Sequence, residues 1–298
     1  MKIAIVGSDS FLAGYIINEL IKTPAIIQLF GISPDKYPEL SFSKFRYPVI
    51  PLDTTQLLDA DSIIYCAGAG IQSNLNENSN LIYELNAFQP IRLLYLLTEN
   101  QYKGKFVSFG SYFEIGNETE ERYYSEIEVA LSNQKVTNHY ATSKRILTRY
   151  LISAPYLPNH FHFILPNIYG LGENANRLIP YLINSIKSKT EIKLTSGSQV
   201  RQFIHTLDIA KAVLKVVNND YPNGLYNLCN SEPIQIKTVV RAVFDIMGKD
   251  SDFNKLKFGI NQRTDTAMPY LLLNSNKALK GLNFQPSISL EKGISTYL

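Results

Sequence analysis

The sequence predicts an α/β fold, a doubly wound parallel sheet with a smaller C-terminal lobe that binds the substrate. Three observations favour this fold. In the first part of the 298-residue chain, short apolar stretches alternate with stretches of amphipathic helical pattern. A turn that begins with a glycine, Gly7, follows the first apolar stretch. After about Gly170 the alternation becomes irregular, and the remaining segments are too short for a second sheet of similar size.

The large domain, residues 1–170, contains the regular part of the pattern. Residues 2–6 form an apolar strand, and apolar side chains then recur at helical spacing over residues 11–21. The same patterns predict further strands at 26–32, 47–52, 62–66, 105–109 and 161–166, and further helices at 80–100 and 138–153. Because these strands alternate with helices, we expect them to be parallel.

The lobe, residues 171–298, has a looser pattern. We expect short helices at 177–188, 207–218 and 236–247, with strand-like pieces at 191–194 and 224–228. A segment near 203–216 is expected to return to the large domain. Ligands of open parallel sheets bind outside the carboxyl ends of the strands, so we expect the lobe to rest on that edge.

Composition excludes several classes of protein. Lysine and arginine exceed aspartate and glutamate by only 29 − 26 = 3, spread along the chain, which argues against nucleic acid or a membrane surface as a partner. No apolar run approaches the roughly 18 residues that span a bilayer, and no secretory signal is visible. The two cysteines, Cys66 and Cys229, are expected to be reduced and buried. We therefore expect a cytoplasmic protein, without a metal site because the histidines lack partners at ligand spacing.

The turn after the first strand has the pattern of a dinucleotide-binding turn. Its usual three glycine positions are held by Gly7, Ser10 and Ala13, all small enough for a pyrophosphate to approach the backbone. Phe11 and Leu12 open the following helix, whose N-terminus favours phosphate. Further residues expected to contact the cofactor follow later strands: Asp53, Thr54, Cys66, Ala67 and Gly68. Residues 1–170 are thus predicted to form a dinucleotide-binding domain.

The end of the second strand bears on which dinucleotide is bound. A carboxylate there binds the ribose hydroxyls of NAD, but this sequence has Gly31 and, two residues later, Ser33. NADP(H) is therefore favoured, with NAD(H) as the alternative, since no arginine is present to clamp a 2′-phosphate. On this interpretation Gly31→Asp should reverse the preference.

A tyrosine and a lysine share one face of a predicted helix. Tyr140 and Lys144 are four residues apart, and an ammonium beside a phenol brings the pKa of the phenol toward the working range. Ser111 follows the fifth strand, where its hydroxyl can bond to an oxygen that gains or loses a proton. These three residues are the predicted catalytic set.

With these motifs in place, the chain resembles the extended short-chain dehydrogenase/reductase family of NAD-dependent nucleotide-sugar epimerases, dehydratases and 4-reductases. The resemblance extends over nearly the whole chain, through KIAIVGSDSFLAG, ELNAFQPIRLL, PNIYGLGENANRLIP, SGSQVRQFIHTLDIA, GLYNLCNSEPIQI and the C-terminal segment. It implies a Rossmann-type sheet, a nucleotide-sugar partner and a homodimer. It also implies a cofactor-site role for Asn86 and substrate-binding roles for Ser111, Asn167, Arg201 and Arg263. Arg177, at the start of a predicted helix, is a further candidate for the nucleotide.

The chain also departs from the family pattern. Leu165 stands where an arginine is usual, and the acidic pair that dehydratases carry after the hydroxyl residue is replaced by Tyr112 and Phe113. Glu114 is one place too far along. Because elimination of water needs those carboxyl groups as acid and base, dehydration is disfavoured.

Three functions remain open. The first is an NAD(P)H-dependent reductase of a nucleotide-linked 4-keto-6-deoxysugar, with Tyr140 as the proton donor. The second is an NAD-dependent nucleotide-sugar 4-epimerase, which would use the same three residues. The third is a catalytically inactive NADP-binding scaffold or sensor, against which the intact catalytic set argues.

Overall fold

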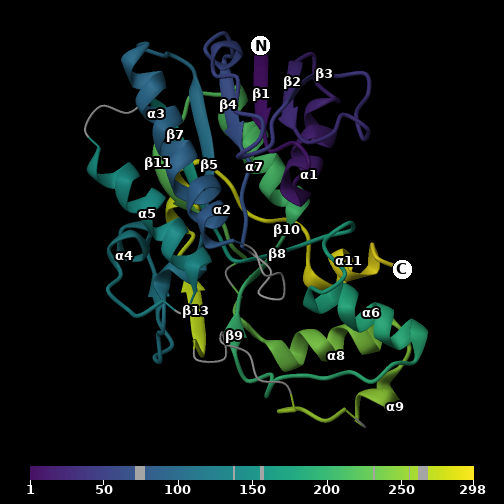
Figure 1. The fold of residues 1–298 in the computed structure, drawn as a ribbon. Helices are drawn as coiled ribbons and strands as arrows, with labels where there is room; N and C mark the ends of the chain where they lie inside the picture. Colours follow the sequence, from purple (N-terminus) through teal and green to yellow (C-terminus); the bar gives the residue numbers. More distant parts are fainter. Residues whose placement is uncertain (71–77, 137, 155–157, 231, 255, 261–267) are drawn as a thin grey trace.

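The computed structural model describes the chain except for residues 71–77, 137, 155–157, 231, 255 and 261–267. Its centre is a parallel sheet of seven strands in the order β11–β7–β5–β4–β1–β2–β3 (Figure 1). The strands are β1 (Lys2–Val6), β2 (Ile26–Gly31), β3 (Ser41–Lys44), β4 (Ser62–Tyr65), β5 (Lys105–Ser111), β7 (Asn159–Leu165) and β11 (Gly224–Asn227). The strand order reverses between β1 and β4, and a crevice at such a point is where doubly wound sheets bind ligands.

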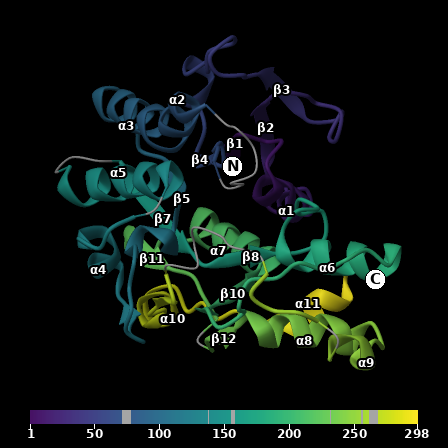
Figure 2. The same cartoon turned by 60° about the horizontal axis from the view of Figure 1, so that its bottom comes forward.

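Helices cover both faces of the sheet, each over its own apolar core. On one face α1 (Phe11–Leu20) and α7 (Thr206–Asn218) pack together over side chains that include Ile5 and Val107. On the other face the core includes Ala4 and Phe106, and the covering helices lie on the opposite side of the sheet from α1 (Figure 2). These are α2 (Ser79–Tyr83), a π-helical turn (Glu84–Phe88), α3 (Gln89–Glu99), α4 (Glu126–Leu131) and α5 (His139–Ser153). Burial on both faces explains why the strands read as continuous apolar runs.

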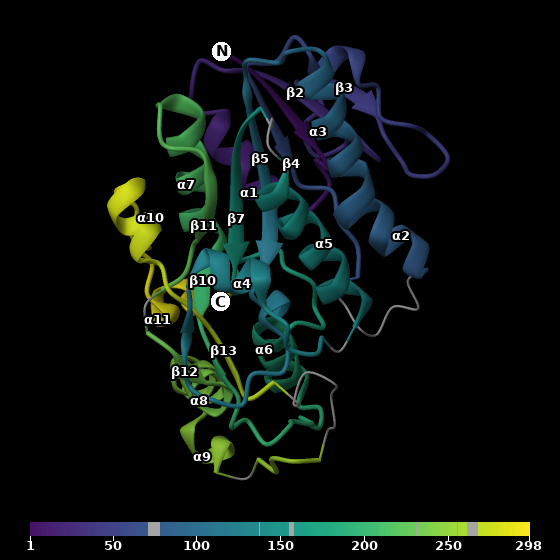
Figure 3. The same cartoon turned by 90° about the vertical axis from the view of Figure 1, so that its left-hand side faces the viewer.

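A smaller lobe lies beyond the carboxyl ends of β5 and β7, whose arrowheads point toward it in Figure 3. Its own core includes Leu182, Val240 and Ile294. The lobe contains α6 (Leu178–Ser188), α8 (Ile236–Ile246), α9 (Asp250–Phe253) and α11 (Leu290–Ser295). The lobe therefore lies where we expected it, at the carboxyl edge of the sheet, where folds of this kind bind ligands.

Two small sheets join the lobe to the large sheet. One has the order β12–β9–β13–β6, and the other pairs β8 with β10. In the first, β13 pairs in parallel with both β6 and β9. The strands are β6 (Tyr123–Tyr124), β8 (Asn167–Tyr169), β9 (Val200–Arg201), β10 (Phe203–His205), β12 (Ile234–Gln235) and β13 (Tyr270–Leu273). The remaining elements are α10 (Asn276–Gly281) and the 3-10 turns η1 (Thr55–Leu57) and η3 (Tyr112–Ile115).

Several expected elements differ from those observed. The strand predicted at 47–52 is wrong: β3 comes earlier, because Pro48 and Pro51 lack the N–H that a strand ladder needs. Residues 191–194 form no strand. The piece at 224–228 is not part of the lobe but β11, an edge strand of the large sheet. The division into residues 1–170 and 171–298 stays a prediction. The segment that returns to the large domain is longer than the expected 203–216, because β11 also belongs to the large sheet. Cys229 is buried as expected, whereas Cys66 is only partly buried.

Among the described residues, no helix is both long and apolar enough to cross a bilayer.

Candidate functional site

The turn after β1 brings the backbone of two strands into close contact. Gly7 has a φ of +83°, and a Cβ added to it would lie 2.4 Å from the backbone nitrogen of Ala67, just beyond β4. Neither the conformation nor the space permits a side chain. The glycine kept from the dinucleotide pattern is therefore the one that the packing of β1 against β4 requires.

The second glycine position of the pattern is held by Ser10, which has become the N-cap of α1. Its Oγ accepts a hydrogen bond of 3.2 Å from the backbone N–H of Ala13. Phe11 is partly buried and packs edge-on against Tyr15, while Leu12 is buried in the core. The first turn of α1 is thus capped and begins just beyond the carboxyl end of β1, which fits a pyrophosphate on the helix N-terminus.

An acidic group lies at the end of β2, although β2 itself ends in Gly31. Asp9, from the turn after β1, accepts from the backbone N–H of Ile32 (2.5 Å) and of Ser33 (3.2 Å). The strand itself carries no carboxylate, as the sequence indicated, but the fold brings one to its end, so the ground for favouring NADP(H) no longer holds and the choice of dinucleotide stays a prediction. A Cβ at Gly31 would lie 2.3 Å from Asp9 Oδ2, so Gly31→Asp would displace this carboxylate instead of adding one to an empty place.

Asp53 has a local role in the structure. Its carboxylate accepts from the backbone and hydroxyl of Thr55 and from the side-chain amide of Gln56, both in η1. These hydrogen bonds lower the pKa of Asp53. Asp53 is exposed and Thr54 partly buried at the carboxyl edge of the sheet, so a contact of either with the adenine stays a prediction.

The segment after β4 is held to the catalytic helix by Asn86. This side chain is buried in the π-helical turn, exchanges two hydrogen bonds with the backbone of Ala69 (3.1 and 2.8 Å) and donates to Ser143 Oγ (2.9 Å). Ser143 lies on α5 between Tyr140 and Lys144. Asn86 therefore ties the strand end at Cys66, Ala67 and Gly68 to the helix that carries the catalytic pair.

The structure brings Ser111, Tyr140 and Lys144 to the carboxyl end of β5. Ser111 is the last residue of β5 and is buried, whereas Tyr140 and Lys144 in the first two turns of α5 are partly exposed. Lys144 Nζ donates to the backbone oxygen of Phe109 (2.8 Å) and lies 5.9 Å from the centre of the Tyr140 ring. Asn138 caps the helix just before these residues. A phenol and an ammonium thus lie side by side at the end of β5.

Burial controls the acidity of the catalytic pair. It raises the pKa of Tyr140 to about 12, while the Ser111 side chain lowers it through hydrogen bonding, the Glu114 charge raises it and the Arg177 charge lowers it. Burial also lowers the pKa of Lys144 to about 8. The surroundings thus raise the pKa of Tyr140 overall, and the effect of Lys144 on that phenol stays a prediction.

Sequence reasoning missed a buried polar group behind these residues. Glu114 is fully buried, accepts from the backbone N–H of Ser111 (2.7 Å) and keeps its second oxygen without a hydrogen-bond partner. Burial raises its pKa to about 7. His162, from β7, bonds to Ser108 Oγ (2.8 Å) and Thr148 Oγ1 (3.0 Å). The signal in the sequence was that Glu114, an acidic residue, follows two aromatic residues just after a predicted strand.

The four predicted substrate residues outside the catalytic set differ in their surroundings. Asn167 begins β8 and is partly exposed. Arg177 pairs with Glu173 (2.6 Å), donates to the Ile168 oxygen (2.7 Å) and places its charge close enough to Tyr140 to lower the pKa of that phenol. Arg201 is buried, and Arg263 lies outside the described residues.

Arg201 has a structural role that the sequence did not predict. Its guanidinium donates to the backbone oxygens of Val200 (2.8 Å), Met268 (2.6 Å) and Pro269 (3.1 Å). Met268 and Pro269 directly precede β13. Arg201 therefore fixes the chain where it enters β13, and a contact with phosphate stays a prediction.

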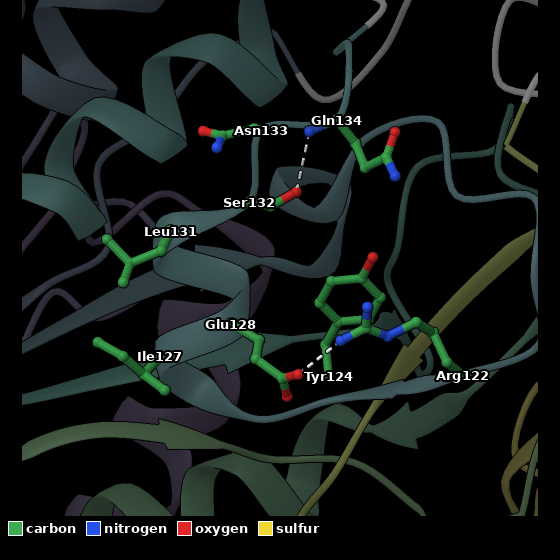
Figure 4. Close-up of a pocket in the computed structure, with 8 residues that line it drawn as sticks. All are labelled: Arg122, Tyr124, Ile127, Glu128, Leu131, Ser132, Asn133 and Gln134. Carbon is green, nitrogen blue, oxygen red and sulfur yellow. Dashed lines mark hydrogen bonds and ion pairs between the residues drawn. The ribbon is translucent and has the colours of Figure 1, made fainter.

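A surface pocket of about 450 Å³ lies elsewhere, on α4 (Figure 4). Its lining includes Tyr124, Ile127 and the ion pair between Arg122 and Glu128 (2.5 Å). None of the predicted site residues lines it, so it contributes nothing to the catalytic site.

Comparison with known proteins identifies the family. Residues 3–229 match the model of the NAD dependent epimerase/dehydratase family. The chain is 25% identical to CDP-abequose synthase from Salmonella muenchen, over 100% of this chain and 97% of that protein. It is 25% identical to dTDP-4-dehydro-6-deoxy-D-allose reductase from Streptomyces bikiniensis, over 40% of this chain and 36% of that enzyme.

The fold has close structural counterparts. UDP-glucose 4-epimerase from Thermotoga maritima, solved with UDP-glucose, superposes with a TM-score of 0.83 over 99% of this chain and 97% of that one, at 16% identity. The Rossmann-type sheet predicted from the sequence is thus confirmed. On the match over residues 3–229, the chain belongs to the NAD dependent epimerase/dehydratase family and is an enzyme that depends on a nicotinamide cofactor.

Proposed function

We propose that the chain reduces the C4 ketone of a nucleotide-linked 4-keto-6-deoxysugar. The observation that carries this proposal is the placement of Ser111, Tyr140 and Lys144 together at the carboxyl end of β5. Burial raises the pKa of Tyr140, which suits its phenol to donate a proton. A ketone that accepts a hydride needs such a donor at its oxygen, whereas an epimerase must first remove a proton from a hydroxyl group.

The described residues fit a nicotinamide dinucleotide. Gly7, which leaves the turn after β1 without a side chain, and the capped N-terminus of α1 follow the carboxyl end of β1, and the charge of Lys144 acts on Cys66 just after β4. Gly7, Ser10 and the first turn of α1 would hold the pyrophosphate. The reduced cofactor supplies the hydride that forms the new C4–H bond.

The protein residues handle the oxygen and its proton. Tyr140 donates the phenolic proton to the C4 oxygen as the C=O π bond breaks, and the resulting phenolate regains a proton from solvent. Ser111 donates a hydrogen bond to the same oxygen and positions it. Lys144 offsets the charge that develops on Tyr140, which lowers the barrier without a change in its own protonation.

Two relatives support the reductase over the alternatives. The name of the Streptomyces relative states a reductase of a 4-dehydro-6-deoxy sugar, over 40% of this chain, and the name of the Salmonella relative, which matches over the full chain, states the synthesis of a CDP-linked sugar. Dehydration is disfavoured because Glu114, the acidic residue nearest to Ser111 in the sequence, is fully buried. The 4-epimerase remains the second candidate because the same three residues serve it. The nucleotide sugar as partner, the homodimer and the cytoplasmic location belong to the proposal.

The test combines cofactor oxidation with product analysis. Nucleotide-linked 4-keto-6-deoxysugars carrying CDP, dTDP, GDP or UDP are offered with NADH or NADPH, and loss of reduced cofactor is followed together with the sugar product. A reductase consumes one reduced cofactor per sugar. An epimerase interconverts sugars with an intact 4-hydroxyl group and consumes none, and that result would replace the proposal.

Tyr140→Phe tests the role of the phenol. Loss of the proton donor should lower kcat by about 10²–10⁴-fold, because general acid catalysis typically contributes that much. Dinucleotide binding should change by less than about threefold, since proton transfer is the step removed. Tyr95→Phe removes the same hydroxyl from an exposed position on α3 and serves as the control. Unchanged turnover in Tyr140→Phe would exclude this mechanism.

A further inference from the structure

We propose that Asp9 makes the enzyme prefer NAD(H) over NADP(H). This inference rests on the dinucleotide-binding role of the proposed function and adds the residue that sets its specificity. Asp9 is not on β2, where a carboxylate that selects NAD is usually found. It reaches the end of β2 from the turn after β1.

The position of the carboxylate is fixed by the backbone. Both oxygens of Asp9 are engaged, Oδ2 by the N–H of Ile32 at 2.5 Å and Oδ1 by the N–H of Ser33 at 3.2 Å. The missing side chain of Gly31 makes room for this arrangement, since a Cβ there would lie 2.3 Å from Oδ2. Asp9 thus occupies the space that an acidic side chain at position 31 would have used.

The carboxylate keeps the capacity to recognise a ribose. An ionised carboxylate has about four acceptor sites, and the two backbone N–H groups use two of them. Asp9 is exposed, so its remaining sites can accept from the two adenosine ribose hydroxyls of NAD. In NADP one of these hydroxyls carries a phosphate, which the carboxylate repels.

A cation beside Asp9 would act in the opposite direction, and the segment that joins β2 to β3 carries one lysine, Lys36. Lys36 follows β2 by five residues, and its Nζ would lie 2.7 Å from a Cβ added to Gly14 on α1. Nζ also lies 5.4 Å from the centre of the Tyr37 ring. Lys36 is therefore directed to the flank of α1 and not to the Ile32–Ser33 backbone that Asp9 holds.

The experiment measures binding directly, without turnover. Dissociation constants for NADH and NADPH are determined by calorimetry for the wild type, Asp9→Asn, Lys36→Met and the charge-matched control Asp245→Asn on α8. The wild type should bind NADH at least about tenfold more tightly than NADPH, from like-charge repulsion at an exposed site. Asp9→Asn should bring the two within about threefold, mainly by tightening NADPH, because the repulsion is removed. The control should keep the wild-type ratio.

A second measurement uses the wild type alone and so does not depend on the folding of a variant. Added salt screens charges at an exposed site, so the NADH preference should shrink as ionic strength rises. A wild type that prefers NADPH, an unchanged ratio in Asp9→Asn, or weaker NADPH binding in Lys36→Met would overturn the inference while leaving the proposed function intact. Failure to bind either dinucleotide would overturn both.

Discussion

Replacing Glu114 by glutamine should change how the stability of the protein depends on pH. Glu114 is fully buried and bonded to the Ser111 backbone, and burial raises its pKa from 4.5 to about 7. Glutamine has nearly the same shape and can keep the hydrogen bond from Ser111, but it does not ionise. The substitution therefore removes one titration from the folded state.

The sign and size follow from linkage. Between pH 4.5 and about 7 folded Glu114 holds a proton that the unfolded chain has released, so its stabilising contribution is complete below the unfolded pKa and is lost as pH rises through the folded one. The full loss is about 3 kcal/mol, of which about 2 kcal/mol falls between about pH 5.5 and 8. Over that pH range the free energy of unfolding of the wild type should fall by about 2 kcal/mol relative to that of Glu114→Gln. Lys144 acts in the same direction, because loss of the Glu114 charge lowers its pKa further.

The assay is denaturant unfolding of both proteins at several pH values, with the free energy of unfolding extrapolated to water. Glu99→Gln, an exposed residue at the end of α3, serves as the control and should follow the wild-type curve. The absolute stability of Glu114→Gln also includes the cost of a buried amide, but that cost does not depend on pH. Parallel curves for wild type and Glu114→Gln would show that the carboxyl does not titrate in this range.

Two further substitutions test residues that position the site. Asn86→Ala should lower the free energy of unfolding by about 2–3 kcal/mol, because it removes three buried hydrogen bonds to Ala69 and Ser143, and it should also lower kcat. A change below about 0.5 kcal/mol in denaturant unfolding would mean that Asn86 does not support α5. Arg201→Gln should lower the melting temperature and raise the KM for the sugar nucleotide, measured by calorimetry and initial rates. A lower melting temperature with an unchanged KM would restrict Arg201 to a structural role.

Most of the sheet could be predicted from the sequence because its strands are buried on both faces. Such strands are apolar throughout, as in β1 and β4, and the pattern is visible without any partner. The third strand was missed because β3 has exposed residues, Ser41 and Lys44, at its ends and lies at the sheet edge. Strands of two or three residues, such as β6 and β9, carry too little pattern to be recognised.

The relative placement of Tyr140 and Lys144 could be predicted because their spacing on one helix fixes it. The acidity of Tyr140 could not, since it depends on burial and on charges from η3 and α6. Asp9 was missed for a related reason. Its reach to Ile32 and Ser33 crosses 23 and 24 positions in the sequence, and only the folded backbone shows that β1 and β2 bring them together.

The pairing of β13 has a consequence for engineering. This strand pairs with β6, which precedes the lobe in the sequence, and with β9 within the lobe. Strand β11, from the middle of residues 171–298, completes the large sheet. A recombinant exchange of residues 171–298 for the equivalent segment of a relative would therefore replace an edge strand of the host sheet as well as the substrate lobe. Grafts into the lobe should instead be restricted to the helices α6 and α8 themselves, which leaves both β11 and β13 native.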